Sequence, residues 1–338
     1  MRQLLSRLPI DTFIALLLAT VGIATLLPAH GSGAVIAGHT ANLAIALLFF
    51  LYGARLSPRA ALDGARHVKL HTMVLLSTFL LFSLLGLAGR ALFPHVLTPA
   101  LWAGVILLCA LPSTVQSSVA FTSIARGNVP AALCAATASN MLGIVITPLL
   151  AGLLLASGRG GISPGMIGDI MLQLLLPFAT GQVARPWIGG WAERNRKVLS
   201  MVDRGSILMV VYVAFSEGMV AGIWHQLDIA MLLRLALVDA TLLGTVLAIT
   251  TLLSRRLGFS RADEITIVFC GSKKSLASGL PIASVLFAGS SVGLIVLPLM
   301  LFHQLQLMVC AVLARRYADA LPVGSGYDLA LGGKAPVA

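Results

Sequence analysis

The sequence of 338 residues is rich in apolar side chains: 58% of the residues are hydrophobic, 10% are charged, and the mean hydropathy is +0.97. This composition leaves too little polar surface to cover a water-soluble globule of this size, which excludes a soluble enzyme or binding domain. The formal net charge of +11 does not indicate nucleic-acid binding, because Lys and Arg lie between apolar blocks rather than in one continuous patch. The lipid bilayer is therefore the expected environment of the chain.

Ten apolar blocks, separated by Gly, Pro or charged residues, predict an all-α integral membrane protein with ten transmembrane helices. Blocks of about 20 residues match the thickness of a bilayer, and the alternating pattern of a membrane barrel is absent from the sequence. We expect the helices near residues 9–28, 40–56, 67–93, 99–125, 130–157, 165–183, 206–224, 229–253, 263–288 and 291–314. The first block resembles a signal peptide, but Asp11 interrupts it, so we expect a retained helix, with cleavage as the alternative.

Lys and Arg are concentrated on one side of this topology, at the termini and in the loops after the second, sixth and eighth blocks. The positive-inside rule places that side in the cytoplasm, so both termini are expected to be cytoplasmic, as an even number of helices requires. We therefore expect a multi-pass protein of the inner membrane, with lipid as its surroundings and no nucleic-acid partner.

The blocks fall into two halves of five with a matching interruption in each half. The fourth block carries Cys109 just before Pro112, and the ninth carries Cys270 just before Gly271. Because five is odd, the second half must enter the membrane from the opposite side. The order of elements therefore predicts two inverted five-helix repeats, an arrangement found in many secondary transporters.

Polar residues follow both interruptions at the expected middle of the membrane. Pro112 removes a backbone donor from the fourth block, and a GSKKS stretch follows Cys270 in the ninth. Unwound segments persist in a membrane only when they are buried in protein or line a watery cavity, so we expect a binding site at the two breaks. The candidate residues at these breaks are Ser113, Thr114, Gln116, Ser117, Ser118, Ser272, Lys273, Lys274 and Ser275.

Lys273 and Lys274 are expected to lie inside the membrane, because a helix that began at Ser275 would be too short to cross it. A lysine in the middle of a helix costs about 2.5 to 3.5 kcal/mol on insertion, which predicts a partner or a cavity. Asp239 in the eighth block and Glu217 in the seventh are possible counter-charges. The alternatives are that both amines extend to the membrane interface, and that Glu217 lies near an interface among serine neighbours.

Further polar residues follow each interrupted block. Ordinary hydrogen bonding between helices is a competing explanation for them, but their place beside the breaks favours a role in binding. The four cysteines lie far apart in apolar segments, and no motif of an enzyme, a metal site or a cofactor site is present, so we expect neither catalysis nor a bound cofactor. The additional candidate binding residues are Thr137, Ser139 and Asn140 in the fifth block, and His303 and Gln304 in the tenth.

The chain through residue 316 resembles the bile acid:sodium symporter superfamily. The segments ARGNV (125–129), TASN (137–140) and CGSKKSLASGLPIASVLF (270–287) are similar to the divergent branch that contains the seventh member of solute carrier family 10 and its bacterial relatives. The resemblance implies one transporter unit with a core domain, a panel domain, discontinuous helices four and nine that cross, and a cytoplasmic tail. In this chain these parts correspond to residues 67–157 and 229–316, residues 9–56 and 165–224, and residues 317–338.

The resemblance also implies where a sodium ion would bind, and this sequence departs from that pattern. Ser117 and Ser118 match a Ser-Asn pair that binds sodium in relatives of the family. Sodium prefers several oxygen ligands, and an ammonium group donates hydrogen bonds without accepting them. The positions that match the other sodium ligands carry no suitable oxygen: Ala132, Ala136, Phe269 and Lys273.

We therefore hypothesise that Lys273 or Lys274 occupies the place of the coupling ion. Protonation of an amine would then replace sodium binding, so the coupling ion is either Na⁺ or H⁺. The expected function is secondary transport of a small or amphipathic organic anion by alternating access. The alternatives are a regulatory membrane protein that keeps the transporter fold without net flux, and a channel.

Overall fold

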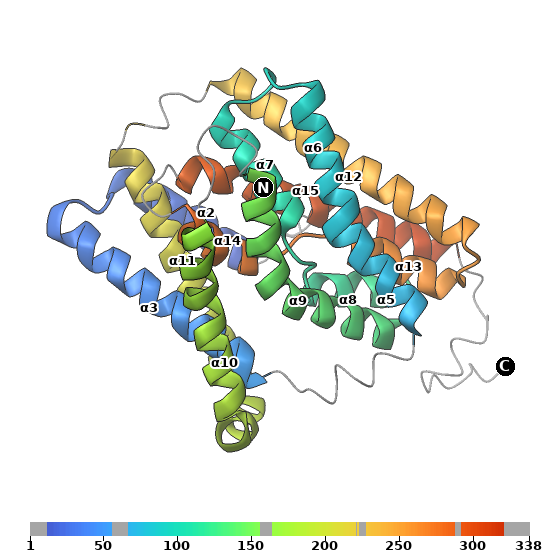
Figure 1. The fold of residues 1–338 in the computed structure, drawn as a ribbon. Helices are drawn as coiled ribbons and strands as arrows, with labels where there is room; N and C mark the ends of the chain where they lie inside the picture. Colours follow the sequence, from blue (N-terminus) through green and yellow to red (C-terminus); the bar gives the residue numbers. More distant parts are fainter. Residues whose placement is uncertain are drawn as a thin grey trace, which may run out of the picture.

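The computed structural model describes residues 12–55, 67–155, 164–220, 222, 228–287 and 292–320, and all regular secondary structure within them is helical (Figure 1). The elements are α2 (Thr12–Leu26), α3 (Gly31–Arg55), α5 (Val68–Leu75), η2 (Leu76–Leu81), α6 (Phe82–Leu92), α7 (Pro99–Ala110), α8 (Gln116–Ile124), α9 (Val129–Leu155), α10 (Pro164–Arg194), α11 (Arg196–Val220), α12 (Ile229–Arg256), α13 (Arg261–Gly271), α14 (Leu276–Leu286) and α15 (Val292–Asp319).

Several of these helices are long and apolar enough to cross a bilayer. Within the described residues six segments meet this requirement: Gly31–Arg55, Val68–Leu92, Val129–Leu155, Lys197–Val220, Ile229–Arg256 and Val292–Asp319. Two shorter apolar helices cover Ala15–Leu26 and Pro99–Ala110. The protein is therefore an all-helical, multi-pass membrane protein.

Some helices extend beyond the apolar blocks that predicted them. Helix α3 begins at Gly31 rather than near residue 40, α11 begins at Arg196 rather than near residue 206, and α10 continues to Arg194 rather than ending near residue 183. Hydropathy marks only the apolar part of a helix, and the polar turns at its ends continue the same backbone hydrogen bonding. The expected end of the seventh block at residue 224 lies outside the described residues.

Capping side chains define where four helices begin. Thr98 accepts a hydrogen bond from the Leu101 N–H ahead of Pro99 in α7, and the Asp228 carboxylate accepts one from the N–H of Met231 in α12. Ser260 and Ser275 do the same for α13 and α14. Such caps satisfy backbone donors that have no partner inside the helix, so the chain can start a new helix directly at these residues.

Helices α2, α3, α10 and α11 pack on one another and lie together on the left of Figure 1. The contact between α3 and α10 is the tightest, because two glycines let the backbones touch. A Cβ atom at Gly53 would overlap the carbonyl oxygen of Phe178, and one at Gly181 would overlap the carbonyl oxygen of Phe50. Small residues at a crossing are the usual way in which membrane helices approach closely.

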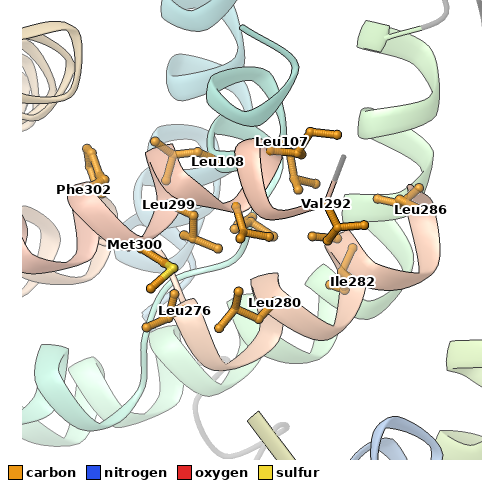
Figure 2. Packing of buried hydrophobic residues seen from close by; sticks show 14 of the residues in the cluster. Leu107, Leu108, Leu276, Leu280, Ile282, Leu286, Val292, Leu299, Met300 and Phe302 are labelled. Carbon is orange, nitrogen blue, oxygen red and sulfur yellow. The ribbon is translucent and has the colours of Figure 1, made fainter. Parts of the chain in front are cut away.

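Helices α7, α14 and α15 form the centre of a second group. Figure 2 shows Leu107 of α7, Leu280 of α14 and Leu299 of α15 gathered between the three helices, where all are buried. The backbones of α7 and α15 also meet, since a Cβ atom at Gly104 would overlap the carbonyl oxygen of Ile295. This packing holds together α7, which ends at the first interruption, and α14, which begins after the second.

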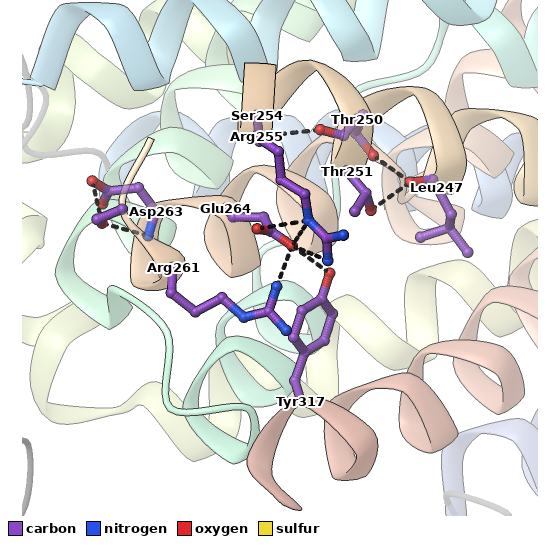
Figure 3. A network of polar contacts seen from close by, with 10 residues as sticks. Leu247, Thr250, Thr251, Ser254, Arg255, Arg261, Asp263, Glu264 and Tyr317 are labelled. Atoms are coloured by element: carbon purple, nitrogen blue, oxygen red, sulfur yellow. Dashed lines mark hydrogen bonds and ion pairs between the residues drawn. The ribbon is translucent and has the colours of Figure 1, made fainter. Parts of the chain in front are cut away.

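A polar network joins the α12–α13 turn to the end of α15 (Figure 3). The buried carboxylate of Glu264 accepts hydrogen bonds from Arg255 Nε at 3.2 Å, from Arg261 at 2.7 Å and from the Tyr317 hydroxyl at 3.2 Å. Tyr317 is buried, and α15 continues to Asp319, whereas we expected the tail to begin at residue 317. The rest of the expected tail, residues 321–338, lies outside the described residues.

The block expected at residues 67–93 contains a feature that hydropathy does not reveal. Between α5 and α6 the backbone forms a π-helical segment, η2, in which an N–H bonds to the carbonyl oxygen five residues earlier instead of four, as the Phe82 N–H does to Ser77. The Thr78 hydroxyl donates to the Val74 carbonyl oxygen at 2.7 Å. The Thr78 carbonyl oxygen accepts a hydrogen bond from the side chain of Lys274.

Candidate functional site

The two helix breaks lie against each other in the interior of the protein. One separates α7 from α8 after Pro112, and the other separates α13 from α14 after Gly271. The backbone N–H of Ser275 donates to the Pro112 carbonyl oxygen at 2.9 Å, and the Ser113 hydroxyl donates to the Cys270 carbonyl oxygen at 2.6 Å. Polar backbone that each break exposes is thus satisfied by the other break, as a membrane interior requires.

Lys274 places its ammonium group in a cage of backbone carbonyl oxygens. The Nζ atom donates to Thr78 at 2.6 Å, to Cys109 at 2.8 Å and to Leu111 at 2.8 Å, and it lies 4.0 Å from the centre of the Phe82 ring. The side chain is fully buried. Three carbonyl acceptors match the three donors of an ammonium group, so the positive charge is held without a carboxylate.

Gln306 holds the backbone of Lys274 in place. Its amide oxygen accepts from the Lys274 N–H at 2.8 Å, its amide nitrogen donates to the Lys274 carbonyl at 2.9 Å, and the same nitrogen lies 2.9 Å from His303 Nδ1. Gln304, the glutamine singled out from the sequence, is half-buried and makes no side-chain hydrogen bond within the described residues. A helix places residues 304 and 306 on different faces, which hydropathy alone does not distinguish.

Lys273 points to a different group of side chains. Its Nζ atom donates to the Ser117 carbonyl oxygen at 2.7 Å and lies 3.8 Å from the centre of the Phe121 ring and 5.5 Å from that of Phe269. The side chain is also fully buried. One hydrogen bond leaves two of its three donors without a described acceptor, in contrast to Lys274.

The hydroxyl groups of the first break bond mainly to one another and to the second break. Thr114 Oγ1 lies 2.6 Å from Ser117 Oγ, and the Ser118 hydroxyl donates to the Phe269 carbonyl oxygen at 3.2 Å. Ser139 from α9 accepts from the Ser113 N–H at 3.1 Å. These contacts bring α8, α9 and α13 together.

The second break has its own hydroxyl contacts. The Ser272 hydroxyl bonds back to the Val268 carbonyl oxygen at 2.6 Å, which closes the end of α13. Ser278 donates to the Asn140 side-chain oxygen at 2.8 Å, and this bond ties α14 to α9.

A cavity of about 620 Å³ lies between the breaks and the helices α2, α3, α10 and α11. Of the residues that the sequence singled out, those that line it are Thr114, Gln116, Ser117, Thr137, Asn140, Ser275 and His303. Ser113, Ser118, Ser139, Ser272, Lys273 and Lys274 lie behind this surface. The cavity therefore brings together about half of the predicted candidates; most of the others support the breaks, whereas Gln304 and Asp239 do neither.

Sequence reasoning missed the charged side of this cavity. Arg55 at the end of α3 and Asp203 in α11 form a two-point ion pair, with contacts of 2.6 and 3.0 Å. Arg204 also lines the cavity, stacks 5.6 Å from the centre of the Phe13 ring, and has no carboxylate partner within the described residues. Arg55 and Arg204 are among the basic residues that we interpreted only as a signal of topology.

Neither of the expected counter-charges pairs with a lysine. Asp239 is fully buried in α12, and neither of its carboxyl oxygens has a hydrogen-bond partner in the described part of the chain. Glu217 is exposed on α11 and forms no ion pair there. Backbone carbonyl groups meet the requirements of Lys274 instead, so an acidic partner is not needed at that position.

Three of the positions that the resemblance matches to sodium ligands are apolar in the structure. Ala132 and Ala136 are buried in a cluster with Ile267 and Cys270, and Phe269 is buried against Phe121. None of these side chains offers an oxygen ligand. The Ser117 and Ser118 hydroxyls are engaged with Thr114 and the second break, as described above.

Two broken helices that meet inside an all-helical membrane protein, beside a charged cavity, define a protein built like a secondary transporter. The model of the SBF-like CPA transporter family matches residues 11–319, and the chain belongs to this family. The family is one of transporters and not of enzymes.

Relatives match the chain over nearly its whole length. An uncharacterized protein of Pseudomonas aeruginosa, PA2026, is 57% identical over 91% of this chain and 93% of its own length. The Escherichia coli K12 protein named "Putative symporter YfeH" is 51% identical over the same shares. Sodium/bile acid cotransporter 7 of Rattus norvegicus is 28% identical over 92% of this chain and 93% of its own length.

Proposed function

We propose that the protein is a secondary transporter that carries a small or amphipathic organic anion across the inner membrane by alternating access. In this proposal ten transmembrane helices form two inverted five-helix repeats. The core domain (67–157 and 229–316) moves against the panel domain (9–56 and 165–224). The observation that carries the proposal is the cavity between the two domains. Residues of both domains line it, so a movement of one domain against the other would open or close the cavity.

The charges of the cavity favour an anionic solute. Its described lining contains two arginines and one aspartate, and Asp203 is already engaged by Arg55. Arg204 is left as a cation without a carboxylate partner, and a guanidinium group suits the planar carboxylate, sulfonate or phosphate of an organic anion. Tyr52, Phe178 and Leu276 supply apolar surface, which suits a solute with an apolar body.

The lysines favour transport that does not require sodium. The name of the rat relative includes sodium, but here the positions that the resemblance matches to further sodium ligands carry three apolar side chains and the Lys273 ammonium. A fixed ammonium repels a second cation and offers it no oxygen ligand. This arrangement supports the proposal of proton coupling or uniport.

The orientation of the protein follows from its basic residues. Both termini are cytoplasmic in our proposal, by the positive-inside rule. Arg55 is the last residue of α3, and Arg204 lies in the half of α11 that begins with Arg196 and Lys197, so the cavity would face the cytoplasm in this conformation.

Binding of organic anions to purified protein in lipid nanodiscs tests the proposal. A panel of mono- and dicarboxylates, aryl sulfates and steroid-like anions would be screened by the shift in the thermal unfolding midpoint, and each hit examined by counterflow in proteoliposomes. We expect stabilisation and counterflow with at least one anion, equally in sodium and choline buffers. Arg204→Gln should weaken this binding at least tenfold, whereas Arg256→Gln, which changes an exposed arginine outside the cavity, should not. A strict sodium requirement would overturn the coupling proposal, and saturable binding of a cation instead of an anion would overturn the solute class.

A further inference from the structure

Asp239 is a buried acid that the proposed binding site does not use. It lies in the middle of α12, its side chain has no exposed surface, and both carboxyl oxygens lack a hydrogen-bond partner among the described residues. It does not line the cavity. An ionised carboxylate in such surroundings is very unfavourable, because neither water nor a fixed donor replaces its hydration.

Helices α13, α15 and α6 and the segment η2 pack on α12, and Cys109 of α7 lies near Asp239. Its carboxyl group lies close enough to the Cys109 thiol of α7 for an electrostatic interaction. The Cys109 sulfur in turn packs on α6, in the space that a Cβ atom at Gly86 would occupy. The carbonyl group of the same Cys109 binds the Lys274 ammonium at 2.8 Å. One residue of α7 therefore touches Lys274 with its backbone and interacts with Asp239 through its side chain.

Other titratable side chains near α12 do not reach the carboxyl group. Helices α6, α13 and α15 pack on α12 or adjoin it and carry Arg90, Cys270 and Cys310, but none of these forms a hydrogen bond or ion pair with Asp239. Lys274 forms no ion pair with it either, since its three donors are occupied by carbonyl oxygens. The remaining way to keep Asp239 buried is to keep it neutral.

We propose that Asp239 is a proton-binding site, that it carries its proton in this conformation, and that it exchanges this proton with water when the helices packed on α12 move away from it. On release, the proton passes to a water molecule and leaves a carboxylate, which the water that has entered then solvates. Rebinding of a proton from water restores the neutral acid. A role for this proton in driving transport would rest on the proposed transport function, whereas the protonation state of Asp239 does not.

Infrared spectroscopy of the full chain in lipid nanodiscs tests the proposal without any solute. A protonated carboxylic acid has its own carbonyl stretching band, and we expect a difference spectrum between the wild type and Asp239→Asn at neutral pH to contain it. Exchange into D₂O should shift this band, as a proton that exchanges with water requires. Asp319→Asn is the control, because this exposed carboxylate at the end of α15 should contribute only carboxylate bands.

Each outcome decides one part of the proposal. Carboxylate bands in place of the acid band would show that Asp239 is ionised, which overturns the proposal. An acid band that does not shift after prolonged exposure to D₂O would show a trapped proton and overturn the exchange step. If Asp239→Asn does not fold, Asp239→Glu is used instead, because it should displace the acid band rather than remove it. Failure of every anion in the binding screen would remove the proposed transport function and leave this result unchanged.

Discussion

The side-chain amide of Gln306 pairs with both backbone groups of Lys274, accepting from its N–H at 2.8 Å and donating to its carbonyl at 2.9 Å. The amide thus replaces the neighbouring helical turn that residue 274 lacks at the break. Buried backbone groups without partners are strongly unfavourable in a membrane, so the break can exist because α15 supplies this amide.

Gln306→Leu should therefore destabilise the protein by about 2 to 6 kcal/mol, from about 1 to 3 kcal/mol for each of the two buried groups left without a partner. Unfolding by sodium dodecyl sulfate in mixed micelles measures this difference. Gln304→Leu is the matched control on the same helix and should change stability by less than about 0.5 kcal/mol. Equal effects of the two changes would contradict the role given to Gln306.

The two lysines should differ in what they contribute to stability. Lys274→Met leaves three buried carbonyl oxygens without their donor, whereas Lys273→Met leaves one and places an apolar chain among the Phe121 and Phe269 rings. We expect Lys274→Met to be the more destabilising change by at least about 2 kcal/mol. The same unfolding titration measures both, and a larger loss for Lys273→Met would contradict the carbonyl cage.

The crossing of α3 and α10 should not tolerate a methyl group. Gly181→Ala would drive a Cβ atom into the Phe50 carbonyl oxygen, which belongs to a helix backbone and has little freedom to move. The expected loss of stability is about 1 to 3 kcal/mol. Gly190→Ala, in the same helix but with nothing near its Cβ position, should instead be neutral or stabilise by up to about 1 kcal/mol.

The Glu264 network should matter for stability and not for solute binding. Glu264→Gln keeps the shape but removes the charge that Arg255 and Arg261 share, and since both arginines are partly exposed the expected loss is only about 1 to 2 kcal/mol. Thermal unfolding in detergent measures the loss. The affinity for any anion found in the screen should stay within about twofold, because the network lies away from the cavity lining. A large change in affinity would mean that this end of α12 is coupled to the site.

Hydropathy predicted the existence of the helices well and their ends less well. The apolar blocks and the breaks after Pro112 and Gly271 follow from local composition. The structure has a helix within each block and interrupts the helices at both breaks. The ends of α3, α10 and α11 were misplaced because polar helical turns carry no hydropathy signal. The inverted symmetry of the two halves and the division into core and panel stay predictions.

The site was harder to predict than the fold, because it depends on which side chains face one another. The sequence identified both lysines but not their acceptors, since a backbone carbonyl has no residue type by which to recognise it. It selected Gln304 where Gln306 makes the contact, and it did not connect Arg55 with Asp203, which are 148 residues apart. Contacts between distant segments of this kind are set by packing rather than by local pattern.

The π-helical segment has a consequence for how related chains should be aligned. Within this segment the Thr78 carbonyl oxygen accepts a hydrogen bond from the Lys274 ammonium. A relative with a smaller, uncharged residue at position 274 has no ammonium that needs this carbonyl oxygen. Its segment corresponding to α5, η2 and α6 can be one continuous α-helix with one residue fewer between positions 76 and 81. In an alignment, a single-residue gap at this place should therefore accompany loss of the lysine. The length of the segment should distinguish relatives that have a lysine at position 274 from those that do not.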